Sequence, residues 1–303
     1  MSVERKPMDG TGIAVMVALC TVLGLHQVAI KVAAPDVAPI LQIGIRSGLS
    51  AILICLLLVV RRECFSLRDG TLLPGTLLGF AFSMEFLFVA EGLRYTTASH
   101  MSVFLYTAPI FTALTLHLFI PSERLSRPQW LGIGLSFCGV VAALGGRLVQ
   151  SGVNVHVLHG DILALLGGVA WASTTVIIRC TRLADAPATK TLLYQLVSAF
   201  ILLLAYAVIS NQAHSFSMTA MAVTSILFQA VVITFATYLI WFSMLRRYHA
   251  SQLSVFLFMT PLFGVSFGVL LLHDPIDPSF ALGALLVLGG ISLVSKQQLR
   301  RRS

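Results

Sequence analysis

Long apolar runs follow one another along almost the whole chain and are separated by short clusters of Pro, Gly and charged residues. A helix rises 1.5 Å per residue, so roughly 20 predominantly apolar residues cross the hydrocarbon core of a bilayer. The pattern therefore predicts an all-α integral membrane protein with ten transmembrane helices. The expected spans are residues 11–33, 37–60, 71–92, 97–119, 127–145, 159–180, 188–209, 220–245, 250–272 and 278–295.

An internal repeat relates two of these spans. Residues 93–111 match residues 245–263 without a gap at an offset of 152, and ten of the 19 positions are identical. Shared membrane composition would match Leu and Val, but it would not place Pro109 in register with Pro261. The match indicates that the two halves of the chain share one plan.

The repeat divides the ten predicted spans into two groups of five. Because five is odd, the second half must enter the membrane from the opposite side. We therefore expect two inverted five-helix repeats, residues 1–148 and 158–303, around a central cavity. Inverted repeats with the substrate held near the bilayer midplane are a recurring transporter plan.

Composition and charge support a membrane location. Hydrophobic residues make up 57% of the 303 positions and charged residues only 11%, against roughly a quarter charged in soluble domains. The net charge of +8 does not indicate nucleic-acid binding, because 16 of the 20 Lys and Arg residues fall in alternate connections between apolar runs. By the positive-inside rule, both termini are expected in the cytoplasm.

The N-terminal apolar run also resembles a secretory signal peptide, with Arg5 and Lys6 ahead of it. Because the run is long and its pattern recurs, we expect it to be retained as the first span. The five cysteines show no paired spacing, so neither a disulfide framework nor a metal site is expected.

Three sequence features carry a family resemblance. They are the repeat itself, the phrase Gly-Leu-Arg-Tyr-Thr-Thr-Ala at 92–98 before a span with Pro109, and Tyr-Leu-Ile-Trp-Phe at 238–242. With them, the chain resembles the drug/metabolite transporter superfamily, EamA type, and within it the bacterial aromatic amino acid exporters. The resemblance implies a carrier of the bacterial inner membrane whose cavity is lined mainly by spans 1, 3, 4, 6, 8 and 9.

Two further positions bear on the resemblance. The acidic residues that commonly follow the fourth and ninth spans correspond to Glu123 and Asp274. The first span has Leu23 and Gly24 where the family often has Trp-Gly, whereas the second half keeps the tryptophan as Trp171.

Ionisable residues inside predicted spans are candidates for function, because inserting one costs roughly 2.5 to 3.5 kcal/mol. Arg46, Glu85 and His26 meet this criterion. Arg46 is expected either to pair with Glu85 or with backbone carbonyls, as a structural lock between spans two and three, or to serve the site. Glu85 is equally suited to structure and to substrate binding. His26 and Gln27 are candidates for hydrogen bonds to a substrate, with a bond to a neighbouring helix as the alternative.

Aromatic residues at mid-depth supply candidate walls for a small-molecule site. These residues are Tyr106, Trp171, Tyr238 and Phe258, with simple packing as the alternative role. Ser102 is a candidate hydrogen-bond donor to an amino acid substrate in its zwitterionic form.

The repeated prolines are expected to bend their spans. Pro109 and Pro261 each free a carbonyl four residues earlier. We expect them to flank the transport pathway as hinges, the alternative being that membrane helices simply tolerate proline.

No hydrolase, zinc-protease or phosphate-loop motif occurs in the sequence, so an enzyme and a cofactor are not expected. The favoured function is export of small metabolites, above all neutral or aromatic amino acids, by a monomeric carrier without nucleic-acid partners. The alternatives are a multidrug exporter that exchanges organic cations for protons through Glu85, and a membrane-embedded enzyme or scaffold.

Overall fold

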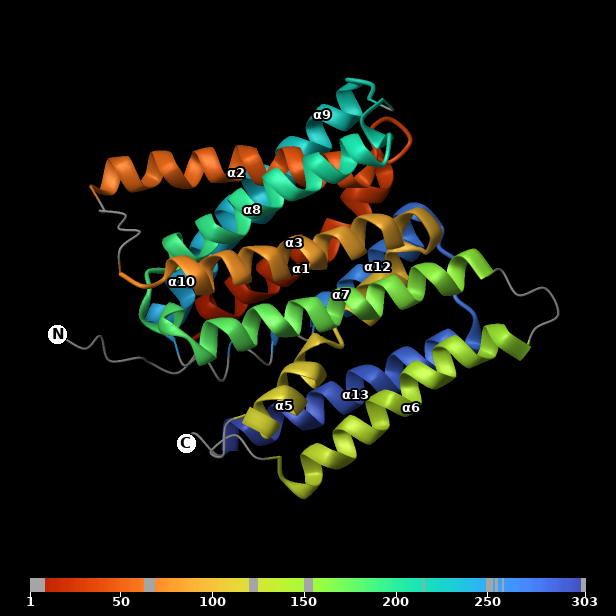
Figure 1. Ribbon diagram of the computed structural model, residues 1–303. Helices are drawn as coiled ribbons and strands as arrows, with labels where there is room; N and C mark the ends of the chain where they lie inside the picture. The colour runs from red at the N-terminus through yellow and green to blue at the C-terminus, as the bar shows by residue number, and fades with distance from the viewer. Residues whose placement is uncertain are drawn as a thin grey trace.

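The computed structural model describes residues 9–62, 69–119, 125–149, 155–214, 216–248, 253, 256–257 and 259–300. These residues form a bundle of helices, with one isolated β-bridge between loop residues Val37 and Phe216 (Figure 1). Seven helices in the described part of the chain are long and apolar enough to cross a membrane. They cover Gly10–Ala33, Pro39–Arg61, Leu72–Tyr95, Ala98–Phe119, His156–Cys180, Ala188–Ile209 and Ala220–Trp241, and two shorter apolar helices cover Met259–Leu272 and Pro278–Leu293.

The helices fall on the predicted spans, except that the ninth span, 250–272, is described as a helix only over Met259–Leu272. The first three are α1 (Gly10–Ala33), α2 (Pro39–Arg61) and α3 (Leu72–Tyr95), and the next regular ones are α6 (Arg127–Val149), α7 (Val155–Cys180) and α8 (Ala188–Ile209). Local signals set several ends. Asp9 caps α1 by accepting from Gly12 N at 2.8 Å, and Pro39 occupies the first turn of α2, where no amide donor is needed.

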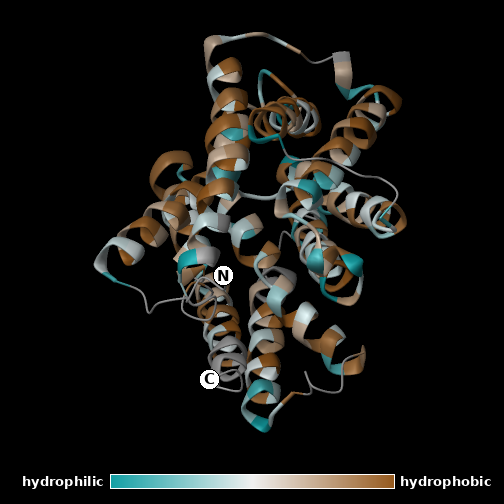
Figure 2. Cartoon of the chain, turned by 90° about the vertical axis from the view of Figure 1, so that its left-hand side faces the viewer, coloured by the Kyte–Doolittle hydropathy of each residue, from teal (hydrophilic) through white to brown (hydrophobic). Residues whose placement is uncertain are grey.

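The bundle is a multi-pass membrane protein, because large apolar side chains cover its outer surface. Val60 and Ile209 are each 80% exposed. Figure 2 shows hydrophobic residues along every helix. Such a surface is stable against lipid tails and would aggregate in water.

Two predicted spans are not regular α-helices. The span at 97–119 is broken into α4 (Ala98–Leu105) and α5 (Ala108–Phe119), with Tyr106 and Thr107 between them. The span at 220–245 is continuous but changes from α9 (Ala220–Leu227) to the π-helix η4 (Phe228–Ala236) and then to α10 (Thr237–Arg247). π-Helical turns are rare and frequently occur at functional sites.

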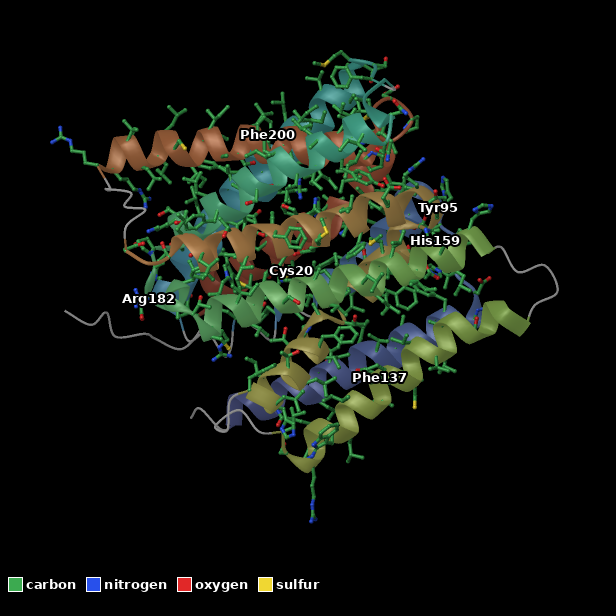
Figure 3. All side chains as sticks on the ribbon, in the orientation of Figure 1. Cys20, Tyr95, Phe137, His159, Arg182 and Phe200 are labelled. Carbon is green, nitrogen blue, oxygen red and sulfur yellow. The ribbon has the colours of Figure 1, made fainter. Side chains whose placement is uncertain are left out.

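The break before Pro109 is satisfied locally. Phe104 O accepts from Thr107 N at 3.2 Å and from Thr107 Oγ1 at 2.6 Å. In the second half, α12 (Met259–Leu272) begins two residues before Pro261. There the thiol of Cys20, inside the bundle (Figure 3), donates to Phe256 O at 3.1 Å.

Helices at equivalent places in the two halves pack against each other: α2 on α8, α4 on α12, and α6 on α13 (Pro278–Arg300). The α6–α13 contact is reciprocal. A Cβ added to Gly139 would lie 2.6 Å from Gly283 O, and one added to Gly290 would meet Gly132 O. Gly132 and Gly283 are 151 residues apart in sequence, and so are Gly139 and Gly290. Exchanging the two halves therefore turns one of these contacts into the other.

The connections meet at two opposite faces of the bundle. The terminal face is the one near the marked chain ends in Figure 1. There Lys190 donates to Asp69, and Thr71 Oγ1 lies 3.2 Å from the hydroxyl of Tyr194. The bonds from Lys190 and Thr71 hold the pKa of Asp69 below its usual range. On the other face, which we call the distal face, Ser217 N donates to Asp36 O at 2.9 Å.

Candidate substrate-binding site

Three buried ionisable side chains converge from α1, α2 and α3. His26 Nε2 lies 2.6 Å from Arg46 Nη1. A guanidinium nitrogen only donates, so His26 Nε2 is the acceptor and carries no proton in this contact. Arg46 is 3% exposed, and its Nε has no hydrogen-bond partner.

The third residue, Glu85, does not pair with Arg46. No ion pair joins the two among the residues that the structure describes, and Glu85 Oε2 has no hydrogen-bond partner. Glu85 is 6% exposed and lies within electrostatic range of Arg46, Tyr106 and Tyr238. The direct pair between Arg46 and Glu85 is therefore absent, and the hydrogen-bond partner of Arg46 is His26.

Aromatic rings border these groups. Arg46 Cζ lies 4.4 Å from the centroid of the Phe86 ring, a cation–π arrangement. On the other side, the rings of Tyr106 and Trp171 are perpendicular, with centroids 5.1 Å apart. Tyr106 sits in the break between α4 and α5, next to Thr260 of α12. The break thus places a ring between the two halves.

The remaining predicted residues divide into three cases. Gln27 is 5% exposed and its Oε1 has no hydrogen-bond partner, so it has capacity to bind. Ser102 Oγ donates to Ala98 O at 2.8 Å, and its Cβ would lie 2.7 Å from a Cβ on Gly264. Ser102 therefore packs between α4 and α12. Phe258 lies outside the described residues.

A second polar group was not singled out from the sequence. Gln229, in the π-helix, donates to Gln42 Oε1 at 2.9 Å. Ser50 Oγ donates to Ala230 O at 3.0 Å. Gln42, Arg46 and Ser50 are spaced by four, so they form one stripe along α2. The four-residue spacing could therefore have predicted a polar face on this helix.

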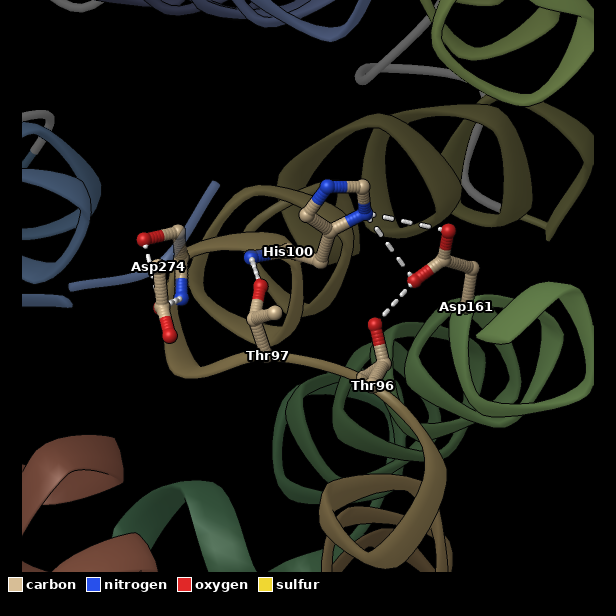
Figure 4. Close-up of polar contacts among 6 residues, drawn as sticks. Thr96, Thr97, His100, Asp161 and Asp274 are labelled. Atoms are coloured by element: carbon tan, nitrogen blue, oxygen red, sulfur yellow. Dashed lines mark hydrogen bonds and ion pairs between the residues drawn. The ribbon is translucent and has the colours of Figure 1, made fainter. Parts of the chain in front are cut away.

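The distal face holds a further buried cluster, which we call the distal cluster: Thr96, His100 and Asp161 (Figure 4). Thr96 Oγ1 donates to Asp161, and His100 Nδ1 lies 3.0 Å from Asp161 Oδ2. The side chains of His100 and Asp161 are both 0% exposed. The ring of Phe280 stacks on His100 with centroids 3.8 Å apart. Asp161 is the third residue of the predicted span 159–180, too close to the membrane surface for the insertion-cost argument to single it out.

A neighbouring contact joins the loop after α12 to the start of α4. Asp274 Oδ2 accepts from Ser99 N at 2.9 Å and from Ser99 Oγ at 2.8 Å. Nearby, Tyr95 and His159 lie together where α3 meets α7 (Figure 3), with ring centroids 5.2 Å apart. The distal ends of α3, α4, α7 and α13 are thus held together by side-chain contacts.

The comparisons with known proteins agree with this architecture. The sequence model of the EamA-like transporter family matches residues 10–145 and again residues 158–296. The uncharacterized transporter YoaV of Bacillus subtilis is 25% identical over 277 residues, which cover 91% of this chain and 94% of YoaV. The probable amino-acid metabolite efflux pump of Salmonella typhimurium is 26% identical over 284 residues, covering 89% of this chain and 90% of that protein.

A solved structure shares the fold. A crystal structure of a protein that is 16% identical covers 96% of this chain and 99% of its own, with a TM-score of 0.63. Together with the family match over both halves, these similarities show that the chain belongs to the EamA-like transporter family.

Proposed function

We propose that this protein is a secondary carrier that exports neutral amino acids, with a preference for large apolar and aromatic side chains. The observation that carries the proposal is the juxtaposition of buried polar groups, Arg46 and Glu85, with the aromatic pair Tyr106 and Trp171. Small-molecule sites combine mostly apolar walls with a few placed polar groups. The name of the Salmonella typhimurium relative supports the same substrate class.

For the architecture we propose ten membrane crossings, arranged as inverted repeats 1–148 and 158–303 around the central site. The pairing of α2 with α8, α4 with α12 and α6 with α13 supports this arrangement. In a carrier of this plan, the halves rock around a fixed site and expose it alternately to the two faces.

For the orientation we propose the bacterial cytoplasmic membrane, with the terminal face in the cytoplasm. The support is the excess of Lys and Arg in alternate connections. Single cysteines at Arg62 and at Asn211, in a cysteine-free background, test it in intact cells. An impermeant maleimide should label position 211 and spare position 62; the reverse pattern would refute the orientation.

We further propose that Pro109 and Pro261 act as hinges, since each lies at or just after the start of a helix segment beside the site. Replacing either with Ala should restore a backbone donor and stiffen the span. Transport should then fall more than the amount of protein in the membrane, as measured by uptake per quantified protein. Wild-type transport by both variants would show that the prolines are only structural.

The test of substrate class is competition for uptake into liposomes that contain the purified protein. Phenylalanine, threonine and alanine should all compete with labelled phenylalanine, in decreasing order. Trp171→Ala should weaken phenylalanine more than alanine, because the lost ring area contacts only a large side chain. Trp130→Ala is the matched control, since Trp130 lies on the outer surface, 48% exposed.

A second function has its own supporting observation. Glu85 is a buried carboxylate with an unpartnered oxygen near the rings of Tyr106 and Tyr238, and such a place also suits an organic cation. A proton-coupled multidrug exporter would therefore transport a bulky cation and lose that activity in Glu85→Gln. If only the cation competes, and Trp171→Ala has no effect, this reading replaces the amino acid carrier.

A further inference from the structure

Arg46 and Glu85 are a basic and an acidic side chain that lie within electrostatic range of each other and make no ion pair. Both are more than nine-tenths buried, and each keeps a polar atom without a hydrogen-bond partner, Nε of Arg46 and Oε2 of Glu85. A buried charge that lacks full pairing is costly, and the simplest remedy would be a direct ion pair. Their separation therefore needs a reason.

The contacts of Arg46 provide one. Its Nη1 is held by His26 at 2.6 Å, and its guanidinium lies over the ring of Phe86 at 4.4 Å. The backbone around it is anchored as well, because the single hydroxyl proton of Ser50 is within hydrogen-bond reach of two carbonyls, Arg46 O at 2.7 Å and Ala230 O at 3.0 Å from Oγ. These contacts hold the guanidinium against His26 of α1 and the ring of Phe86 on α3, without an ion pair to the neighbouring Glu85. Two complementary charges are thereby kept available within one site.

We propose that Arg46 binds the α-carboxylate and Glu85 the α-ammonium of the transported amino acid, with its side chain against Tyr106 and Trp171. This inference rests on the proposed function and refines it, since it assigns Arg46 a recognition role in place of the structural role expected from sequence. The guanidinium fork matches a carboxylate, and the carboxylate of Glu85 accepts from an ammonium. His26 is a positioning residue that holds the guanidinium through Nη1.

The arrangement makes a specific demand on the substrate: both charged groups must be present. A compound with only one of them leaves the opposite buried charge unpaired, which a polar site rejects strongly. Phenylethylamine lacks the carboxylate, and 3-phenylpropionate lacks the ammonium, while both keep the aromatic ring. Neither should therefore replace phenylalanine.

The experiment is competition by these three compounds against labelled phenylalanine, with purified protein in liposomes. In the wild type, each single-charge compound should compete about 10- to 100-fold more weakly than phenylalanine. Arg46→Gln should weaken phenylalanine and bring phenylethylamine close to it. Glu85→Gln should also weaken phenylalanine, and it should bring 3-phenylpropionate close to phenylalanine as a competitor. The matched controls are Arg94→Gln and Glu91→Gln, which remove an Arg and a Glu paired with each other at the distal end of α3.

The outcomes separate this inference from the proposed function. If phenylalanine is transported and phenylethylamine competes equally well, the assignment of Arg46 and Glu85 to the two charged groups is wrong. The proposed amino acid carrier is then unaffected. A uniform loss in both variants, without a change of ranking, would also refute the assignment. No competition by any amino acid would overturn both. Should a variant fail to fold, the wild-type ranking of the three compounds still decides.

Discussion

Replacing His100 with Leu is expected to destabilise the protein more than any other single change in the distal cluster. The substitution removes the imidazole that lies 3.0 Å from Asp161 Oδ2 and leaves a fully buried carboxylate short of a partner. Breaking a buried charged contact from one side costs about 3 to 5 kcal/mol of unfolding free energy. The melting temperature of purified protein in detergent should therefore fall clearly below that of the wild type.

A control and a double variant make this test specific. His159→Leu, on α7 two residues before Asp161, removes an exposed histidine and its ring contact with Tyr95, so the melting temperature should fall much less than in His100→Leu. The double variant His100→Leu/Asp161→Leu should be more stable than His100→Leu alone, since removing both partners leaves no uncompensated charge. If His100→Leu melts like the wild type, the distal cluster does not stabilise this face.

Replacing Gly139 with Ala should separate α6 from α13. The new Cβ would lie 2.6 Å from Gly283 O and 2.7 Å from Val287 N, which are backbone atoms that cannot rotate away. Overpacking of this kind typically costs about 1 to 3 kcal/mol, and close backbone approach through small residues is what holds membrane helices together. A lower melting temperature in detergent is the expected result.

Gly134 on the same helix is the matched control. A Cβ there would meet nothing within 4 Å, so Gly134→Ala should be neutral or gain up to about 1 kcal/mol of helix propensity. Equal melting temperatures for the two alanine variants would show that the α6–α13 contact is looser than the structure has it.

The helices themselves were predictable because their signal is local. Roughly 20 apolar residues between polar clusters identify a span whatever its neighbours are. Pro109 likewise marked the break between α4 and α5, since a missing amide donor acts within one turn. The π-helix was not predictable. Its nine residues, Phe228–Ala236, are an ordinary apolar run, and contacts such as Ser50 with Ala230 O accompany its unusual winding.

The sequence identified the residues of the candidate site, but it did not identify which of them contact one another. The cost of burying charge identified Arg46, Glu85 and His26, yet it could not say which two would meet. A pair between Arg46 and Glu85 was one expectation from the sequence, whereas the guanidinium contacts His26 at 2.6 Å. The choice depends on how α1, α2 and α3 rotate against one another. Ser102 shows the same limit: a small residue favours close helix approach, but the sequence does not say that its partner is Gly264 of α12.

The central claim, that this EamA-like protein is an amino acid carrier, is tested most directly by counterflow. Liposomes with the purified wild-type protein are loaded with unlabelled phenylalanine and diluted into a trace of labelled phenylalanine. We expect a transient accumulation of label inside these liposomes, above that in protein-free liposomes, and unlabelled phenylalanine in the outer medium should abolish it. Counterflow of an organic cation, with none for phenylalanine or any other neutral amino acid, would contradict it.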